Sequence, residues 1–256
     1  MNSITDLEYP ENEKLLIIEL QKLFDEAYEY GKHISFKKPG YTYNDLTTDG
    51  FFPYYLSQNI KVLFIGLEHY GFLEKQNYID SMYQAYKNGS VNNNQFNYLM
   101  YYISYAFNNS FPDWHSIPVI NNKTFATEEG VSFAFMNISK FTNDTDSSKA
   151  DKELINEFAI VYSNDNIRLL QRQIEILNPD IIITMNINEY TDIKYLGVCD
   201  FRCCDDGKVS IYDYKLLNRN IPLFDTYHFS KRGMNEILEL YIPLKNAYNK
   251  YQRGCV

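Results

Sequence analysis

The sequence predicts an α/β fold, with a single three-layer α/β/α domain built around a mostly parallel, roughly four-stranded central sheet. Short continuous apolar runs alternate along the chain with longer segments of helical periodicity. This alternation is typical of buried parallel strands joined by crossover helices. The 256 residues contain no internal repeat and no low-complexity linker, so one domain spanning 1–256 is expected.

The first quarter of the chain is predicted to hold one helix, one loop and one buried strand. Residues 12–33 carry apolar side chains at helical spacing, and Gly31 is a natural stop. Residues 36–53 are polar and contain Pro and Gly, which is typical of a loop. The run "KVLFIG", 61–66, is apolar throughout and predicts a strand buried on both faces. Residues 1–55 are therefore interpreted as an N-terminal helix and loop extension.

The middle of the chain is predicted to contain helices and two more strands. Residues 75–108 read as one or two helices interrupted at "KNGSVNNN", and "VSFAFMNISKF", 131–141, as a second buried strand. A helix is expected over 164–177, ended by Pro179, followed by a strand over 181–185.

The last part of the chain is predicted to close the sheet. Residues 187–218 are mixed, and a short helix followed by a hairpin around Asp206-Gly207 is expected there. The run "IPLFDTYH", 221–228, predicts another strand, and residues 230–251 a closing helix.

Composition limits the partners that the protein can take. The net charge is −9 and the pI is near 5, which argues against a protein that coats nucleic acid, because sequence-independent affinity comes mostly from Lys and Arg. A small basic mouth on an acidic body stays compatible with these values. The acidic N-terminus has no apolar signal region, and no apolar run approaches the ~20 residues that span a bilayer. We expect a cytoplasmic monomer that does not bind membranes.

The four cysteines, Cys199, Cys203, Cys204 and Cys255, fit neither a disulfide framework nor a zinc site. Reduced cysteines are expected, with no metal and no cofactor. Several catalytic motifs are also missing: GxGxxG, the P-loop, HExxH and GxSxG.

Polar side chains follow the ends of the predicted strands. They are Glu68 with its neighbours, Asn137, Asn186 and His228. In open α/β sheets ligands bind beyond the carboxyl ends of the strands, so these residues are the site candidates. Each has a structural alternative: Glu68 can cap a helix, Asn137 can bind turn backbone, and His228 can be a packed ring.

Four segments form a set with a characteristic order and spacing: "VLFIGLEHYG", "FMNISKF", "LLQRQIEILNPDIIITMN" and "LFDTYHFS". They resemble the motifs of the uracil-DNA glycosylase superfamily, most closely the branch that also includes iron–sulfur enzymes. In order, these motifs are a strand ending Gly-x-Asp/Asn/Glu-Pro-Tyr/Gly, a strand ending in Asn with Lys three residues on, a helix–strand unit, and Thr-Tyr-His-Pro-Ser. The resemblance covers about residues 60–250 and implies the fold of that superfamily.

The resemblance implies an enzyme that flips uracil out of DNA and breaks its N-glycosidic bond. Glu68 would position the attacking water or stabilise the oxocarbenium-like sugar. His228 would donate a hydrogen bond to O2 of the leaving uracil anion. Asn137 would read the base by donating to O4 and accepting from N3–H, whereas cytosine presents the opposite pattern.

Further residues are assigned to the substrate by the same resemblance. Those expected to bind the base or the sugar are Gly66, Leu67, His69, Tyr70 and Phe72, with Tyr70 excluding the thymine methyl group and Phe72 stacking on the base; Tyr98 and Tyr102 are other stacking candidates. Those expected to contact DNA phosphates or backbone are Lys140, Ser230, Lys231 and Arg232.

The sequence departs from the family pattern at several positions. His69 and Phe229 stand where the family has prolines that stiffen loops pinching the DNA. Glu68 is one methylene longer than the usual Asp, and Asn186 replaces a glycine. Met234 is the only apolar choice for an intercalating residue. The cysteines cannot follow the iron–sulfur spacing, so no cluster is expected.

Two function classes therefore stay open. One is a glycosylase acting on uracil or a related damaged base, in DNA (single-stranded DNA included) or in a free nucleotide. The other is a catalytically inactive relative that binds a base, nucleotide or protein partner. Retention of Glu68, Asn137 and His228 favours the enzyme, which we adopt, while the charge and the lost prolines favour the binding protein. A deoxyribosyltransferase or nucleoside hydrolase suits an acidic protein but lacks the expected motif.

Overall fold

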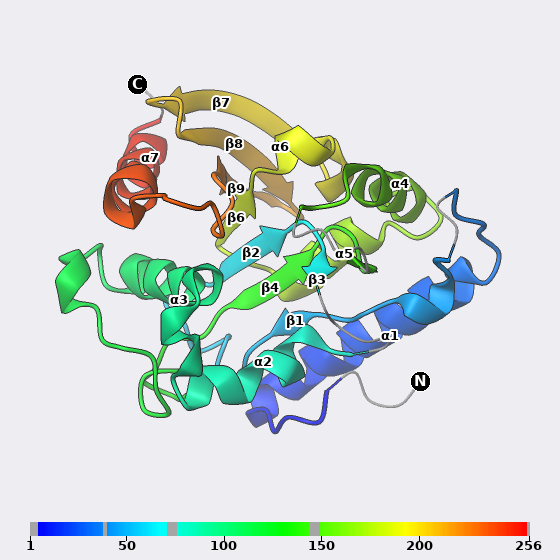
Figure 1. The fold of residues 1–256 in the computed structure, drawn as a ribbon, viewed down its shortest axis with the longest axis horizontal. Coiled ribbons are helices and arrows are strands. Elements are labelled where there is room, and N and C mark those ends of the chain that lie inside the picture. The colour runs from blue at the N-terminus through cyan, green and yellow to red at the C-terminus, as the bar shows by residue number, and fades with distance from the viewer. Residues whose placement is uncertain (1–4, 38–39, 71–75, 144–148, 255–256) are drawn as a thin grey trace.

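The structure, a computed structural model, describes residues 5–37, 40–70, 76–143 and 149–254. It has an α/β fold in which seven strands form one mixed sheet in the order β1-β4-β2-β6-β9-β8-β7 (Figure 1). The strands are β1 Gly50–Phe51, β2 Val62–Gly66, β4 Ala134–Asn137, β6 Ile181–Met185, β7 Cys199–Asp205, β8 Val209–Leu216 and β9 Arg219–Thr226. Two short strands, β3 His69–Tyr70 and β5 Thr142–Asn143, pair in parallel outside this sheet.

The four strands predicted from apolar runs lie at the centre of the sheet. They are β4, β2, β6 and β9, and each pairs in parallel with its neighbour. The prediction of a roughly four-stranded, mostly parallel sheet is nevertheless wrong for the sheet as a whole. β1 pairs antiparallel with β4 at one edge, and β8 and β7 add two antiparallel strands beyond β9.

The additional strands come from segments without a continuous apolar run. β1 is two residues long, and most residues of β7 are exposed or half-buried at the edge of the sheet. The predicted hairpin around Asp206-Gly207 is confirmed, since this turn joins β7 to β8. Residues 206–208 connect the strands, and the turn is closed by Lys208 N–H, which donates to the Asp205 carbonyl at 2.9 Å. Its two central residues, Asp206 and Gly207, have positive φ, 46° and 69°, a conformation that Asp and Gly adopt more readily than most residues.

Helices cover both faces of the sheet (Figure 1). The side chains of α1, α4, α5 and α6 pack into a core on one face, and those of α2, α3 and α7 into a core on the other. The helices are α1 Lys14–Gly31, α2 Tyr78–Lys87, α3 Gln95–Asn108, α4 Lys152–Tyr162, α5 Leu169–Leu177, α6 Ile187–Tyr190 and α7 Ile242–Gln252.

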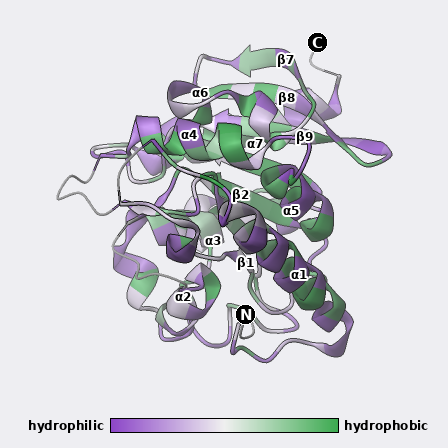
Figure 2. Ribbon diagram, turned by 90° about the vertical axis from the view of Figure 1, so that its right-hand side faces the viewer, coloured by the Kyte–Doolittle hydropathy of each residue, from purple (hydrophilic) through white to green (hydrophobic). Residues whose placement is uncertain are grey.

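Alternation along the central strands divides their side chains between the two cores. In β2, Leu63 and Ile65 point to the face covered by α1, whereas Val62 and Phe64 point to the face covered by α3. All five residues of β2 and all five of β6 are buried. Figure 2 shows the resulting concentration of hydrophobic residues along the central strands.

The helix boundaries follow local chemistry. The predicted interruption within 75–108 is confirmed as the break between α2 and α3, and Asn94 caps α3 by accepting from Asn97 N. The closing helix differs from its prediction: residues 237–241 form a π-helical turn before α7 begins. Pro243 has no N–H to bond back to Glu239, so a regular α-helix cannot run through this point. No helix in the described part of the chain is long and apolar enough to cross a membrane.

Candidate active site

The carboxyl ends of the four parallel strands bring the candidate residues to one edge of the sheet. Gly66 at the end of β2 is in register with Asn137 at the end of β4, and Met185 of β6 with Thr226 of β9. Neighbouring strands lie ~4.8 Å apart, so the backbones of β4 and β9 are ~14 Å apart across three spacings. Asn137, at the end of β4, and His228, two residues after the end of β9, therefore lie along the same edge of the sheet, with the ends of β2 and β6 between them.

Asn137 has both of its backbone groups bound, but its side-chain amide is free. Its N–H donates to Asp49 Oδ2 at 2.8 Å, and its carbonyl accepts from Lys140 Nζ at 2.7 Å. The residue is only 2% exposed, and its side-chain amide has no hydrogen-bond partner among the described residues. A Cβ at Gly66 would lie 2.3 Å from Asn137 Oδ1, so only glycine leaves room for the amide. The first-motif glycine thus shapes the position of Asn137.

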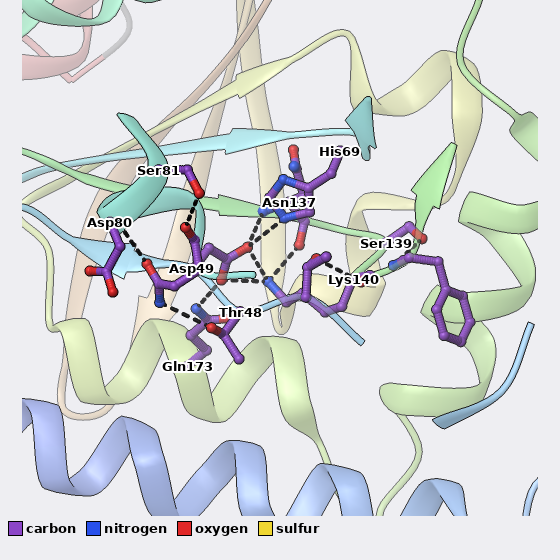
Figure 3. Close-up of polar contacts among 12 residues, drawn as sticks. Thr48, Asp49, His69, Asp80, Ser81, Asn137, Ser139, Lys140 and Gln173 are labelled. Atoms are coloured by element: carbon purple, nitrogen blue, oxygen red, sulfur yellow. Dashed lines mark hydrogen bonds and ion pairs between the residues drawn. The ribbon is translucent and has the colours of Figure 1, made fainter. Parts of the chain in front are cut away.

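A buried carboxylate, Asp49, anchors this part of the site (Figure 3). Asp49 is 0% exposed and accepts from Lys140 Nζ with both oxygens, at 2.9 and 2.8 Å. Its Oδ1 also accepts from Gln173 Nε2 at 2.6 Å. His69 Nε2 lies 3.8 Å from Asp49 Oδ2. Asp49 therefore connects the end of β4 to helix α5.

Burial and charge set the protonation states of this cluster. Burial alone would raise the pKa of Asp49, but the ammonium of Lys140 and the surrounding donors outweigh it, and the pKa lies below its usual value. Burial lowers the pKa of Lys140, and the carboxylate of Asp49 opposes that change. Burial also lowers the pKa of His69, which is therefore neutral at pH 7. The cluster holds one compensated pair of charges.

These positions correct two of the site expectations, those for Lys140 and His69. Lys140 is 0% exposed in its ion pair with Asp49, so it cannot contact a DNA phosphate. His69 is 2% exposed, beside Asp49 and 5.7 Å from the ring of Tyr78, and both of its ring nitrogens are fully enclosed, so its ring is packed inside the protein rather than presented to a substrate. The side chain of Leu67 is buried in the core at 4% exposure. Tertiary burial has overridden the usual surface preference of Lys.

Glu68 has a structural role in this structure. Its Oε1 accepts from Asn143 Nδ2 and from the backbone N–H of Asp151, both at 2.8 Å. Asp151 is the N-cap of α4, so Glu68 ties β2 to the start of that helix. A negative charge there is also favourable toward the helix dipole.

His228 lies on the loop after β9, with its ring held on two sides. Phe96, in the first turn of α3, stacks on it with ring centroids 5.6 Å apart. The backbone N–H of Ser230 donates to His228 Nδ1 at 3.3 Å, and Ser230 Oγ lies 2.7 Å from the same nitrogen. An Nδ1 that accepts from a backbone N–H carries no proton, so the neutral ring has its proton on Nε2. His228 therefore offers a hydrogen-bond donor.

Burial lowers the pKa of His228 to about 4, against an ordinary value of 6.5. Between these two values the unfolded chain binds a proton that the folded protein does not, so lowering the pH from 6.5 to 4 lowers stability. The slope for one such group reaches ~1.4 kcal/mol per pH unit.

We expect the urea midpoint to fall more between pH 7 and pH 5 in the wild type than in His228→Gln. His69 acts in the same direction, so the variant should keep part of the loss. Equal losses would show that His228 is protonated in the fold.

The loop that follows His228 is fixed by packing. Phe229, in the place of the family proline, is fully buried and lies edge-on to Phe64 at 5.8 Å. Gln95 Nε2 donates to the Phe229 carbonyl at 2.8 Å. Met234, the only apolar choice for an intercalating residue in this loop, is 5% exposed in the same core, so its side chain is not presented to a base stack.

The exposed polar residues of this loop remain candidates for phosphate contact. Ser230, Lys231 and Arg232 are all exposed. Lys231 Nζ, however, pairs with Glu239 Oε2 at 2.9 Å and lies 3.6 Å from the ring centroid of Tyr227. Its charge is therefore partly compensated.

The two described aromatic residues that were expected to stack on the base, Tyr98 and Tyr102, contact other side chains of the protein. Phe72 lies outside the described residues, as does the side chain of Tyr70. Tyr98 donates to Glu236 Oε1 at 2.7 Å, and Tyr102 packs against Trp114 at 4.9 Å. The ring that the sequence did not reveal is Phe96, which lies between His228 and Phe135 of the sheet, 5.9 Å from the latter. The one sequence feature that could have pointed to Phe96 is its position in the first turn of the helix that became α3.

No metal centre is formed by the described residues, since no group of three His, Cys, Asp or Glu side chains gathers closely enough. Cys199, which is half-buried, and Cys204, which is exposed, are free thiols, and Cys255 lies outside the described part of the chain.

No protein-family model matches the sequence, and a search of curated proteins finds no significant match.

Proposed function

We propose that the protein hydrolyses the N-glycosidic bond of uracil or a related damaged base, after the base has been flipped out of a DNA strand. The observation that carries this proposal is the Asn137 amide, which is 2% exposed and has no partner among the described residues. Buried amides are nearly always hydrogen-bonded. An amide without a partner at the carboxyl edge of a parallel sheet points to a ligand that supplies it.

The two groups of an amide match one edge of uracil. Nδ2 of Asn137 would donate to O4, and Oδ1 would accept from N3–H. Cytosine has a donor and an acceptor in the reverse positions, so it would leave both groups unsatisfied. Because the amide is buried, each unsatisfied group costs ~1–3 kcal/mol. The site would therefore prefer uracil.

His228 supports departure of the base. Cleavage of the glycosidic bond leaves a uracil anion with negative charge on O2, and the Nε2–H of a neutral His228 would donate to it. Such a donor in a site shielded from water is worth several kcal/mol of transition-state stabilisation. With its pKa near 4, the ring is neutral and uniform in protonation at physiological pH.

The charge distribution favours a small or single-stranded substrate. Lys140 is buried and Lys231 is shared with Glu239, so two of the expected phosphate contacts are lost or weakened. On a chain with a net charge of −9, long duplex contacts are poorly supported. A single strand that presents one base needs fewer such contacts. The motif resemblance to uracil-DNA glycosylases supports the same chemistry.

One observation favours the inactive alternative. Glu68 Oε1 is occupied by Asn143 and by the N–H of Asp151, so this oxygen is not available to orient a water. If the other oxygen does not serve that purpose, the site would bind a base without cleaving its bond. The second candidate function is therefore a protein that recognises a base or nucleotide.

A strand-break assay tests the proposal. Oligonucleotides with one uracil, single-stranded or paired with G or A, are incubated with protein at low salt and then treated with alkali. We expect breaks at uracil with the wild type and a rate ~10- to 100-fold lower with Asn137→Ala, which removes two hydrogen bonds. Asn166→Ala, at an exposed asparagine before α5, should cleave as the wild type. A folded wild type that makes no breaks would contradict the hydrolase and favour the binding protein.

A further inference from the structure

We infer that Asp49 and Lys140 act as a positioning pair that fixes Asn137 for base recognition, which makes the N-terminal extension, residues 1–55, an integral part of the site. The inference rests on the proposed function, because it takes Asn137 as the residue that reads the base. Neither Asp49 nor Lys140 needs to touch the substrate. Their effect would pass through the backbone of Asn137.

Asp49 and Lys140 each bind one backbone group of Asn137. Asp49 Oδ2 accepts from the N–H of Asn137 at 2.8 Å, and Lys140 Nζ donates to its carbonyl at 2.7 Å. The two side chains also bind one another through both carboxylate oxygens. Both backbone groups of Asn137 are thus held by one buried ion pair (Figure 3).

A second contact from the extension holds the same turn. Thr47 N donates to the carbonyl of Lys140 at 2.8 Å, and Thr47 Oγ1 donates to the same oxygen at 2.7 Å. Both Thr47 and Lys140 are fully buried. The segment 47–49 therefore braces residues 137–140 from outside the region that carries the glycosylase-like motifs.

Base recognition by an amide depends on such bracing. Uracil and cytosine differ in the order of donor and acceptor along one edge, so the preference for uracil depends on how well both amide atoms of Asn137 meet that edge. A backbone held at N–H and at C=O fixes the position of Cβ, and with it the distance and angle at which the amide can reach N3–H and O4 of uracil. Loss of the pair should therefore lower the preference for uracil more than it lowers affinity for the strand.

Binding to uncleavable oligonucleotides tests the inference without relying on turnover. The probes are single strands with one 2′-fluoro-2′-deoxyuridine or 2′-fluoro-2′-deoxycytidine, whose fluorine destabilises an oxocarbenium-like transition state. Fluorescence anisotropy gives the ratio of the two dissociation constants. We expect Asp49→Asn to lower the wild-type preference about tenfold, equivalent to one misplaced hydrogen bond. Thr47→Val, a milder change, should lower it two- to threefold.

Gln173→Met is the matched control. It removes a hydrogen bond to Asp49 Oδ1, at 2.6 Å, but does not touch the Oδ2 that holds Asn137. It should lower thermal stability and leave the preference unchanged.

The inference is overturned if folded Asp49→Asn keeps the wild-type preference, or, where that variant does not fold, if Thr47→Val keeps it. A wild type without any preference for uracil would contradict the base reading by Asn137 itself, and the inference with it. Loss of the preference in Gln173→Met to the same extent would show general loosening of the core and would also overturn it.

Discussion

Replacement of Lys140 by methionine is expected to lower the free energy of unfolding by about 3–5 kcal/mol, because it leaves the carboxylate of Asp49 buried without its cation. Both members of this pair are 0% exposed. Urea unfolding at pH 7, followed by circular dichroism, measures the change. The control is Lys14→Met, which breaks an exposed pair with Glu11, 58% and 86% exposed, and should change stability far less.

The same pair predicts a pH dependence with a defined sign. The folded pKa of Asp49 lies below its usual value, so its contribution is complete above about pH 4 and is lost as the pH falls through the folded value. In Lys140→Met the buried carboxylate of Asp49 has no cation beside it, so burial should raise its folded pKa above the unfolded value, and lowering the pH should then lessen the destabilisation caused by the substitution. A variant as stable as the wild type at pH 7 would contradict the buried ion pair.

Replacement of His228 by alanine is expected to lower the rate of uracil release ~100- to 1000-fold, the usual cost of removing one oxyanion donor. The substitution should lower the maximal rate and not the affinity for the substrate, because His228 binds negative charge that develops only as the glycosidic bond breaks. Single-turnover kinetics on a uracil-containing single strand measure it. His115→Ala, an exposed histidine on the loop after α3, should cleave as the wild type.

The pH profile of the rate gives a second check on His228. Because its pKa is about 4 and the free proton lies on Nε2, the wild-type rate should not depend on His228 protonation between pH 5 and pH 8. An inflection near pH 6.5 that disappears in His228→Ala would show that the ring titrates normally and is not held neutral by burial.

The central strands could be predicted because each is a continuous apolar run. "KVLFIG" and "IIITM" are buried on both faces, and such runs have few alternatives to a parallel strand. β1 escaped prediction because two residues carry no pattern. β7 was expected only as an arm of the hairpin around Asp206-Gly207. Its place in the main sheet was not predicted, because it lies at the sheet edge, where charged residues such as Arg202 are ordinary.

The polar part of the site could be predicted only in outline. Asn137 and His228 were found because parallel strands end at one edge, a rule that depends on topology alone. Asp49 lies in a polar stretch that reads as a loop, and nothing in the sequence marks it as fully buried. Lys140 was expected at the surface for the same reason. A buried pair depends on two residues 91 positions apart meeting in the fold, and a single sequence does not record that meeting.

The measurement that tests the account most directly is the release of free uracil. Strand breaks can come from a trace nuclease, but free base comes only from cleavage of the N-glycosidic bond. Wild-type protein is incubated with a single-stranded uracil oligonucleotide, and the released base is quantified by mass spectrometry beside the abasic sites in the same sample. The account predicts free uracil equal in amount to abasic sites, with both strongly reduced in His228→Ala and in Asn137→Ala. Folded wild type that releases no uracil, or breaks the strand without releasing the base, would contradict it.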